Sequence, residues 1–276
     1  RQGGAIRLSR EFGPARSNQV DAEYSINTTA IENLDEANSD FSLEFEEEAK
    51  RLGDTTSFQQ SIGSLRLGIQ RDRRDNRLYP SKGYFLRAQS RVAQEALASD
   101  VNFYNPEFDG RNYIPFMGPT FWAVQFNYKT IEGFGGGEAG RVPSFEKFFL
   151  GGNQNVRGYD YRDLAVYKKD CGPGDPDPKT YTRCSGGKSA FYSSLEFRYK
   201  VLERTMQLFA FTDIGNVYEN SWEIDSDFKQ SAGVGFRVRS PMGPINISWS
   251  QRMEPTTPDS NDSGETQIDF NIGTGF

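Results

Sequence analysis

The residues of this chain that are best placed to do chemistry are one arginine and two carboxylates. Arg157 lies in the segment Val156-Arg157-Gly158-Tyr159, while Glu196 and Asp213 follow further along the chain. A guanidinium presents its donors in a rigid fork that carboxylates accept in pairs. On its own, Arg-Gly-Tyr indicates no more than a solvated surface arginine. If its loop folds back against a wall, Glu196 and Asp213 are the candidate partners.

The absence of histidine limits the chemistry that this chain can perform. Without imidazole, histidine-dependent zinc sites and Ser-His or Cys-His nucleophiles are excluded, so we expect neither an enzyme nor a metal or cofactor site. The net charge is −6 and no basic stretch is present, which argues against nucleic acid as a partner. Cys171 and Cys184 are the only cysteines, and their Gly/Pro/Asp-rich surroundings favour a disulfide in an oxidising compartment.

The elements that must position these residues show alternation of apolar and polar side chains. At the C-terminus, Ile268, Phe270, Ile272 and Phe276 face one way, while Gly273 and Gly275 and the polar residues between them face the other. Near the N-terminus, alternate positions from 44 to 48 are glutamates, which a hydrated lumen can hold but a soluble core cannot bury. The alternation predicts apolar side chains facing lipid and polar ones facing water.

The alternation predicts about twelve antiparallel strands. They are expected near residues 2–12, 18–31, 38–50, 60–72, 82–95, 100–115, 120–132, 187–200, 205–218, 228–240, 243–253 and 265–276. A soluble sandwich also alternates, but its strands are typically about 5 to 6 residues long. No run of about 18 apolar residues offers a membrane helix, whereas a barrel strand needs only about 9 to 11 residues to cross. We therefore predict an all-β transmembrane barrel.

One long connection, residues 132–187, separates the seventh and eighth predicted strands and carries Arg157. Glu196 falls on the polar face of its strand, since its two neighbours are apolar. Asp213 shares its parity with Phe211, so pointing Asp213 inward also brings Phe211 inward. We expect Phe211 to pack beneath the folded-in loop, which makes it an exception to the rule that apolar side chains face lipid. Gly158 permits a positive φ or a close approach to the wall.

Four motifs together resemble the C-terminal barrel of the BamA/TamA/two-partner-secretion superfamily of outer-membrane assembly and translocation proteins. They are the strand-turn-strand segment 72–84, Leu150-Gly151-Gly152 with Val156-Arg157-Gly158-Tyr159, the wall segment from Phe211 through Gly215 to Val217, and the C-terminal segment from Phe270 to Phe276. Within the superfamily, the loop cysteines and the turn 240–244 look most like BamA. The resemblance implies that Asp213, with Glu196 as a second partner, holds Arg157.

The resemblance also implies a function in the outer membrane of bacteria or of organelles of bacterial origin. An insertase of this family lets the edge strand of an unfolded β-barrel client pair at a lateral seam formed by the first and last strands. The expected partners are outer-membrane lipid, barrel clients and accessory lipoproteins. In this chain the seam would involve residues 266–276, where Gly273 and Gly275 weaken packing. A polypeptide secretion pore and a passive channel remain alternatives, and a lipid hydrolase is the weakest.

Barrels of the BamA type have sixteen strands and follow periplasmic POTRA modules, whereas this sequence shows about twelve strands and no POTRA-like pattern. We therefore expect residues 1–276 to form a single barrel domain, with POTRA domains in the parent chain. The sequence starts at Arg1 without a signal-like stretch, which suggests a processed product or a fragment. A fragment of a larger barrel and a reduced barrel are both consistent with this strand number. Residues 2–12 are therefore not assigned as the first strand of the seam.

Overall fold

The computed structural model describes residues 2–31, 58–137, 139–168, 182–202, 205–241 and 243–272. Nearly all of them lie in strands or in the connections between strands, and the helical elements are short 3-10 turns. The strands are β1 (Gln2–Phe12), β2 (Asn18–Ile31), β3 (Phe58–Asp72), β4 (Gly83–Ala93), β5 (Phe103–Pro115), β6 (Thr120–Thr130), β7 (Glu132–Gly133), β8 (Val166–Lys168), β9 (Thr182–Ser185), β10 (Ser189–Leu202), β11 (Met206–Tyr218), β12 (Lys229–Ser240), β13 (Gly243–Arg252) and β14 (Thr266–Ile272).

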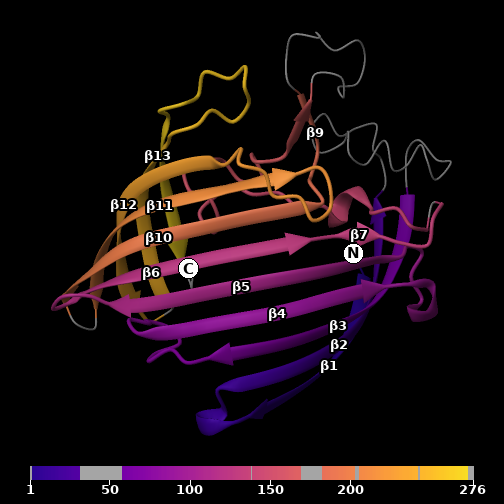
Figure 1. The fold of residues 1–276 in the computed structure, drawn as a ribbon, viewed down its shortest axis with the longest axis horizontal. Helices are drawn as coiled ribbons and strands as arrows, with labels where there is room; N and C mark the ends of the chain where they lie inside the picture. Colours follow the sequence, from indigo (N-terminus) through magenta and orange to yellow (C-terminus); the bar gives the residue numbers. More distant parts are fainter. Residues whose placement is uncertain are drawn as a thin grey trace.

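A single antiparallel sheet contains all the long strands. Its order is β1-β2-β3-β4-β5-β6-β10-β11-β12-β13-β14, with the short β7 paired to β5. The sheet curves strongly, so that β12 and β13 turn away behind the strands drawn at the front (Figure 1). Each long strand pairs with its neighbour along the chain, except that β6 and β10 pair across the long connection. This topology confirms the predicted all-β, antiparallel barrel wall.

The structure contains a long strand at eleven of the predicted positions, with ends that differ by a few residues. The remaining prediction, residues 38–50, lies outside the described residues. The expected disulfide also lies outside them, as do Gly273, Gly275 and Phe276. The long connection contains β7, the β8–β9 hairpin and a 3-10 turn at Ser144–Glu146, none of which the alternation predicted. These elements are too short to produce a readable period.

The predicted apolar-out alternation is confirmed along the wall. On β10, Leu195 is 40% exposed whereas the adjacent Glu196 is fully buried. On β14, Ile268 and Phe270 are exposed and Asp269 between them is buried. We call the face with the buried polar residues the inner face and the opposite one the outer face. Within the described ranges, no helix has the length and apolar character of a membrane span.

The two ends of the sheet carry connections of different length. At one end, which we call the short-turn end, strands are joined through intervals 13–17, 73–82, 116–119, 203–205 and 241–242. At the other, the intervals are 32–57, 94–102, 131–188, 219–228 and 253–265. Outer-membrane barrels have short periplasmic turns and longer extracellular loops. By this rule we expect the short-turn end on the periplasmic side.

Candidate functional site

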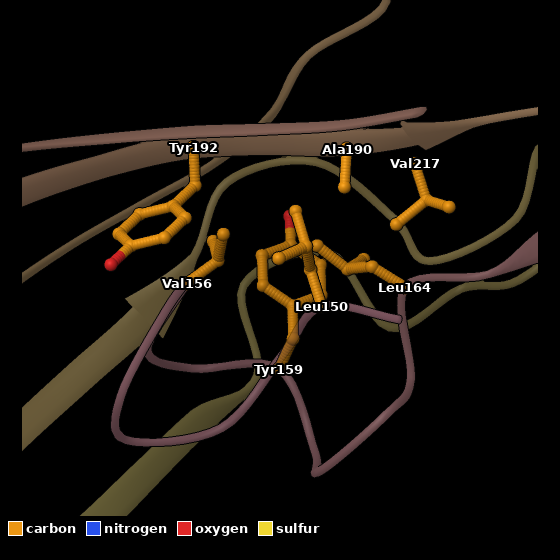
Figure 2. Close-up of a cluster of buried hydrophobic side chains, with 7 residues drawn as sticks. All are labelled: Leu150, Val156, Tyr159, Leu164, Ala190, Tyr192 and Val217. Carbon is orange, nitrogen blue, oxygen red and sulfur yellow. The ribbon is translucent and has the colours of Figure 1, made fainter. Parts of the chain in front are cut away.

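The long connection folds back onto the inner face and packs there through apolar side chains. Val156 and Tyr159 are fully buried, and they lie against residues of β10 and β11 (Figure 2). The cluster consists of Leu150, Val156, Tyr159, Leu164, Ala190, Tyr192 and Val217. Burying side chains of this size stabilises the docked loop by the usual hydrophobic contribution of about 1.5–3 kcal/mol each. The loop thus lies on the inner face, as predicted, and is packed there against β10 and β11.

Arg157 reaches both of the carboxylates that the sequence singled out. Its Nε donates to Asp213 Oδ2 at 2.7 Å and its Nη2 to Asp213 Oδ1 at 2.8 Å, a bidentate pair. Its Nη1 donates to Glu196 Oε1 at 2.7 Å, and its backbone N–H donates to Asp213 Oδ2 at 3.1 Å. The Ser194 hydroxyl lies 3.0 Å from Nη2 and donates to Asp213 at 2.5 Å. One guanidinium therefore joins the loop to two neighbouring strands.

The surroundings of this network exclude water and balance its charges. The side chains of Glu196 and Asp213 are fully buried and that of Arg157 is 9% exposed. Arg198 Nε donates to the other oxygen of Glu196 at 2.7 Å, so the network holds two arginines and two carboxylates. Buried charges are tolerated when they are paired and hydrogen-bonded in this way. The arrangement suits holding a loop in place, and its charged groups are occupied by one another.

Phe211 turns inward, as its parity with Asp213 predicted, and forms the floor beneath Arg157. The Arg157 Cζ lies 3.4 Å from the centre of the Phe211 ring, which is buried, in cation–π geometry. Phe209 is also buried on this face. Two aromatic rings therefore occupy inner-face positions that alternation otherwise reserves for polar side chains.

The room for these rings comes from two glycines on β12, which the sequence analysis did not single out. Gly233 pairs with Phe211 and Gly235 pairs with Phe209. A Cβ atom at Gly233 would lie 2.6 Å from Phe211 Cζ, and one at Gly235 would lie 2.5 Å from Phe209 Cζ. One sequence signal could have indicated this packing: Phe209 and Phe211 are two residues apart, and so are Gly233 and Gly235.

Two other glycines shape the contact between the loop and the wall. Gly158 has a φ of 88°, a left-handed conformation that disfavours other residues. A Cβ added to it would lie 3.4 Å from the Ser231 Cβ and the Ser250 Oγ. Gly215 makes room for Val156, whose Cγ2 lies 2.9 Å from the position of a Cβ there. Gly158 thus has the positive φ that the sequence suggested, whereas a Cβ beside the wall would make ordinary van der Waals contact.

A second clamp holds the loop to β13, and the sequence reading missed its central residue. Arg252 Nε donates to the Gly158 carbonyl at 2.8 Å, and its Nη1 donates to Asp262 at 2.5 Å. The Tyr159 hydroxyl donates to the carbonyls of Gln230 and Glu254, at 3.1 and 2.7 Å. Arg252 ends its strand outside any of the quoted motifs, so no local signal marked it.

Removing the Tyr159 hydroxyl tests the contribution of this second clamp. Tyr159→Phe keeps the ring in its apolar cluster but removes both hydrogen bonds, so unfolding should become easier by about 0.5–1.5 kcal/mol. Denaturant unfolding of the barrel in detergent measures this difference. Tyr161→Phe is the matched control, because Tyr161 lies in the same connection and is 82% exposed. Equal effects of the two substitutions would contradict the clamp.

The stability of the second clamp should depend on pH through Asp262, which lies in the connection between β13 and β14. Burial alone would raise the pKa of its carboxyl, but hydrogen bonds from Ser260, Thr256 and Arg252 outweigh burial and lower the pKa. Because the pKa of Asp262 is lower in the folded state, its ionised carboxylate stabilises the folded protein fully above the unfolded-state pKa, about 4. This stabilisation disappears as the pH falls toward the folded-state pKa.

The corresponding measurement is the melting temperature of the wild type and of Asp262→Asn across a pH series. We expect the wild type to melt higher at pH 7 and the gap to narrow below about pH 4. A gap that stays constant down to pH 2.5 would exclude ionised Asp262 as its source.

The loop also reaches the final strand of the sheet. The Asn153 side-chain amide donates to the backbone carbonyl of Phe270, in β14, at 3.2 Å. Phe270 and Ile272 have exposed side chains on the outer face. The structure therefore brings the loop motif, the two carboxylates and the start of the predicted C-terminal signal into one region. Among the described residues, no group of three or more metal-ligating side chains is present.

Together these features define an outer-membrane β-barrel whose inner face holds an arginine-anchored loop. A family model described as the Omp85 superfamily domain matches residues 1–276. The chain belongs to the Omp85 superfamily and is an outer-membrane protein, which confirms the resemblance found in its motifs.

Two curated relatives carry the name outer membrane protein assembly factor BamA. The protein of Nitratidesulfovibrio vulgaris (strain Hildenborough) is 26% identical over 209 residues, which cover 75% of this chain and 24% of the relative. The protein of Neisseria meningitidis serogroup B (strain MC58) is 23% identical over 261 residues, covering 82% and 30%. The chain thus spans less than a third of the length of these relatives.

Two solved structures share the fold. BamA from Haemophilus ducreyi lacking POTRA domains 1–3 superposes with a TM-score of 0.75 at 15% identity, covering 98% of this chain and 54% of that one. CdiB from Acinetobacter baumannii superposes with a TM-score of 0.55 at 12% identity, covering 98% and 41%. The higher score supports the BamA-like form of the barrel.

Proposed function

We propose that this chain is the barrel domain of an outer-membrane protein assembly factor, an insertase. Unfolded β-barrel proteins are its clients, and a client strand pairs with an exposed strand edge at a lateral seam. Pairing at an edge is favourable in lipid because each unpaired N–H or C=O group there costs several kcal/mol. Residues 1–276 act as one barrel domain, and POTRA domains and accessory lipoproteins are partners of the parent protein.

One observation carries the proposal: the arginine-anchored loop contacts the last described strand. Arg157 fixes the loop to β10 and β11, and Asn153 of the same loop binds the Phe270 carbonyl of β14. Within the described sheet, β14 has β13 as its neighbour and so offers its other edge. A loop fixed at one end to the wall can hold the last strand in position while a client pairs. The names of the curated relatives add support.

In this role the Arg157 network supplies position and no bond chemistry. Its carboxylates already accept hydrogen bonds from the two arginines, so none of them is placed as a free general base. The expected effect of losing it is a loop that no longer lies against the wall.

The test is depletion of the protein in its own host, with rescue by the wild type, Arg157→Ala or Asp213→Ala. The readout is the folded level of several unrelated outer-membrane barrels. We expect both variants to lower many of these levels together, while an Arg141→Ala control, an exposed arginine of the same connection, rescues fully.

Other outcomes separate the alternatives. Loss of one dedicated exported protein, with other barrels at normal levels, would overturn the insertase in favour of a polypeptide secretion pore. Steady open conductance in planar bilayers, with no effect on barrel levels, would instead indicate a passive channel.

A further inference from the structure

A polar cavity lies at the short-turn end of the inner face, and at Arg237 it borders the Arg157 network, since both arginines lie over the Phe209 ring. Its volume is about 440 Å³. One side is the turn 73–82 between β3 and β4, and the other is the ends of β10, β11 and β12. Arg239 of β12 lies over the Tyr79 ring at 5.0 Å, so the turn crosses the inner face to meet strands far from it in the sheet order.

The cavity carries an excess of positive charge. Lys200, Arg237 and Arg239 line it, and Asp75 is the only carboxylate among the described lining residues. The other lining residues are neutral.

Asp75 is occupied by its own turn. Its Oδ1 accepts the backbone N–H groups of Asn76, Ser81 and Lys82 at 2.9, 2.9 and 3.1 Å, and its Oδ2 accepts the Ser81 hydroxyl at 2.7 Å. Burial alone would raise the pKa of Asp75, but the Ser81 hydrogen bonds help to lower it, so the carboxyl stays ionised at neutral pH. One carboxylate against three cations leaves the cavity with a net charge of about +2.

Arg237 is the strongest indication that something binds here. It is only 7% exposed and lines the cavity, and its one described hydrogen bond runs from Nε to the Asn246 side-chain oxygen. A guanidinium has five N–H donors, so four have no described protein acceptor. Glu196 lies close enough to attract Arg237, but its two oxygens already accept from Arg157 and Arg198, so an anion in the cavity would supply Arg237 with a direct ionic partner.

The position of the cavity narrows the class of anion. Gln207 lines the cavity, while Leu208, the next residue along β11, is exposed on the outer face. Lipid contacts the outer face, so lipid headgroups are not the natural occupants. The natural occupant is instead a water-soluble anion that enters the barrel from the short-turn end.

We propose that Lys200, Arg237 and Arg239 bind a carboxylate of a polypeptide on the inner face of the barrel. The inference rests on the proposed function, because that function brings polypeptides to this protein. Arginine pairs bind carboxylates with defined geometry, and an inorganic phosphate offers the same chemistry. The test therefore compares these two sources of the anion.

The probe is a pair of short peptides of the same uncharged sequence, one with a free C-terminal carboxylate and one with a C-terminal amide. Binding to the protein in lipid nanodiscs is measured by calorimetry. The free carboxylate should bind at least about tenfold more tightly, which corresponds to one charge-assisted hydrogen bond. Lys200→Gln with Arg239→Gln should reduce this difference, because Arg237 then remains as the one cation among the described lining residues. Both side chains are partly exposed, so the fold should tolerate their replacement.

Arg73→Gln is the matched control, because Arg73 is an exposed arginine in the same turn that does not line the cavity. It should leave the tenfold difference unchanged. Equal binding of the two peptides, or a difference that the double substitution leaves unchanged, would overturn the proposal. Competition by inorganic phosphate at the same concentration as the peptide would assign the site to small anions and also overturn it. Client assembly plays no part in this assay, so its result is independent of the insertase test.

Discussion

Arg157→Ala should lower the free energy of unfolding of the barrel by about 3–5 kcal/mol, the usual cost of removing one partner from a buried ionic network. The loss leaves Asp213 fully buried with the Ser194 hydroxyl as its remaining described side-chain donor. It also removes the cation above the Phe211 ring. Denaturant unfolding in detergent, followed by tryptophan fluorescence, measures the difference.

Three further variants make the Arg157 result specific. Arg157→Lys keeps the charge but loses the fork that reaches both carboxylates, so its cost should be intermediate. Arg141→Ala should change stability by less than about 0.5 kcal/mol, as is usual for exposed sites. Asp213→Ala combined with Arg157→Ala should cost less than the sum of the single changes, since both act on one network. If Arg157→Ala were as mild as Arg141→Ala, the docked loop would not depend on the network.

A second large effect is expected from Gly233→Ala on β12. The added Cβ would lie 2.6 Å from Phe211 Cζ and 2.2 Å from the Trp249 carbonyl oxygen, so the ring and the neighbouring backbone must move. Overpacking of this kind typically costs about 1–3 kcal/mol. Displacing Phe211 also disturbs the cation–π contact with Arg157, which places the cost at the upper end. The same unfolding measurement applies.

The control for Gly233 is Gly4→Ala on β1. Gly4 is also a strand glycine, and a Cβ there would meet nothing within 4 Å, so the substitution should be nearly neutral. Gly233→Ala should cost less in a Phe211→Ala background than in the wild type, because the ring that clashes is absent there. A Gly233→Ala protein as stable as Gly4→Ala would show that the ring does not need this space.

Periodicity predicted the wall well because a strand on a membrane barrel must separate lipid-facing from inward-facing side chains at every second residue. The parity of Glu196 with its exposed neighbour Leu195, and that of Asp213 with Phe211, followed from this rule alone. The contacts of Arg157 with these carboxylates needed one further step, the inward folding of the loop, and the motif resemblance supplied it.

Other parts of the site were not predictable because they depend on contacts between distant strands. Arg252 contacts the loop only because β13 lies beside it in three dimensions, and nothing in its local sequence indicates this. The contact between Tyr79 and Arg239 crosses the inner face between strands that are not neighbours. The role of Gly233 becomes visible only when its pairing with Phe211 is known.

The position of Arg157 in the chain has a consequence for the kinetics of folding. Its partners Glu196 and Asp213 follow it by 39 and 56 residues, and the Tyr159 acceptor at Glu254 follows by 95. Contacts of this sequence separation carry a loop-closure entropy, and they reach their native geometry only when the strands that hold the partners are in place. The loop therefore cannot dock until β10, β11 and β13 are in place. Its docking is a late step that reports the assembly of these three strands, and protection of the loop from protease would time that step during refolding.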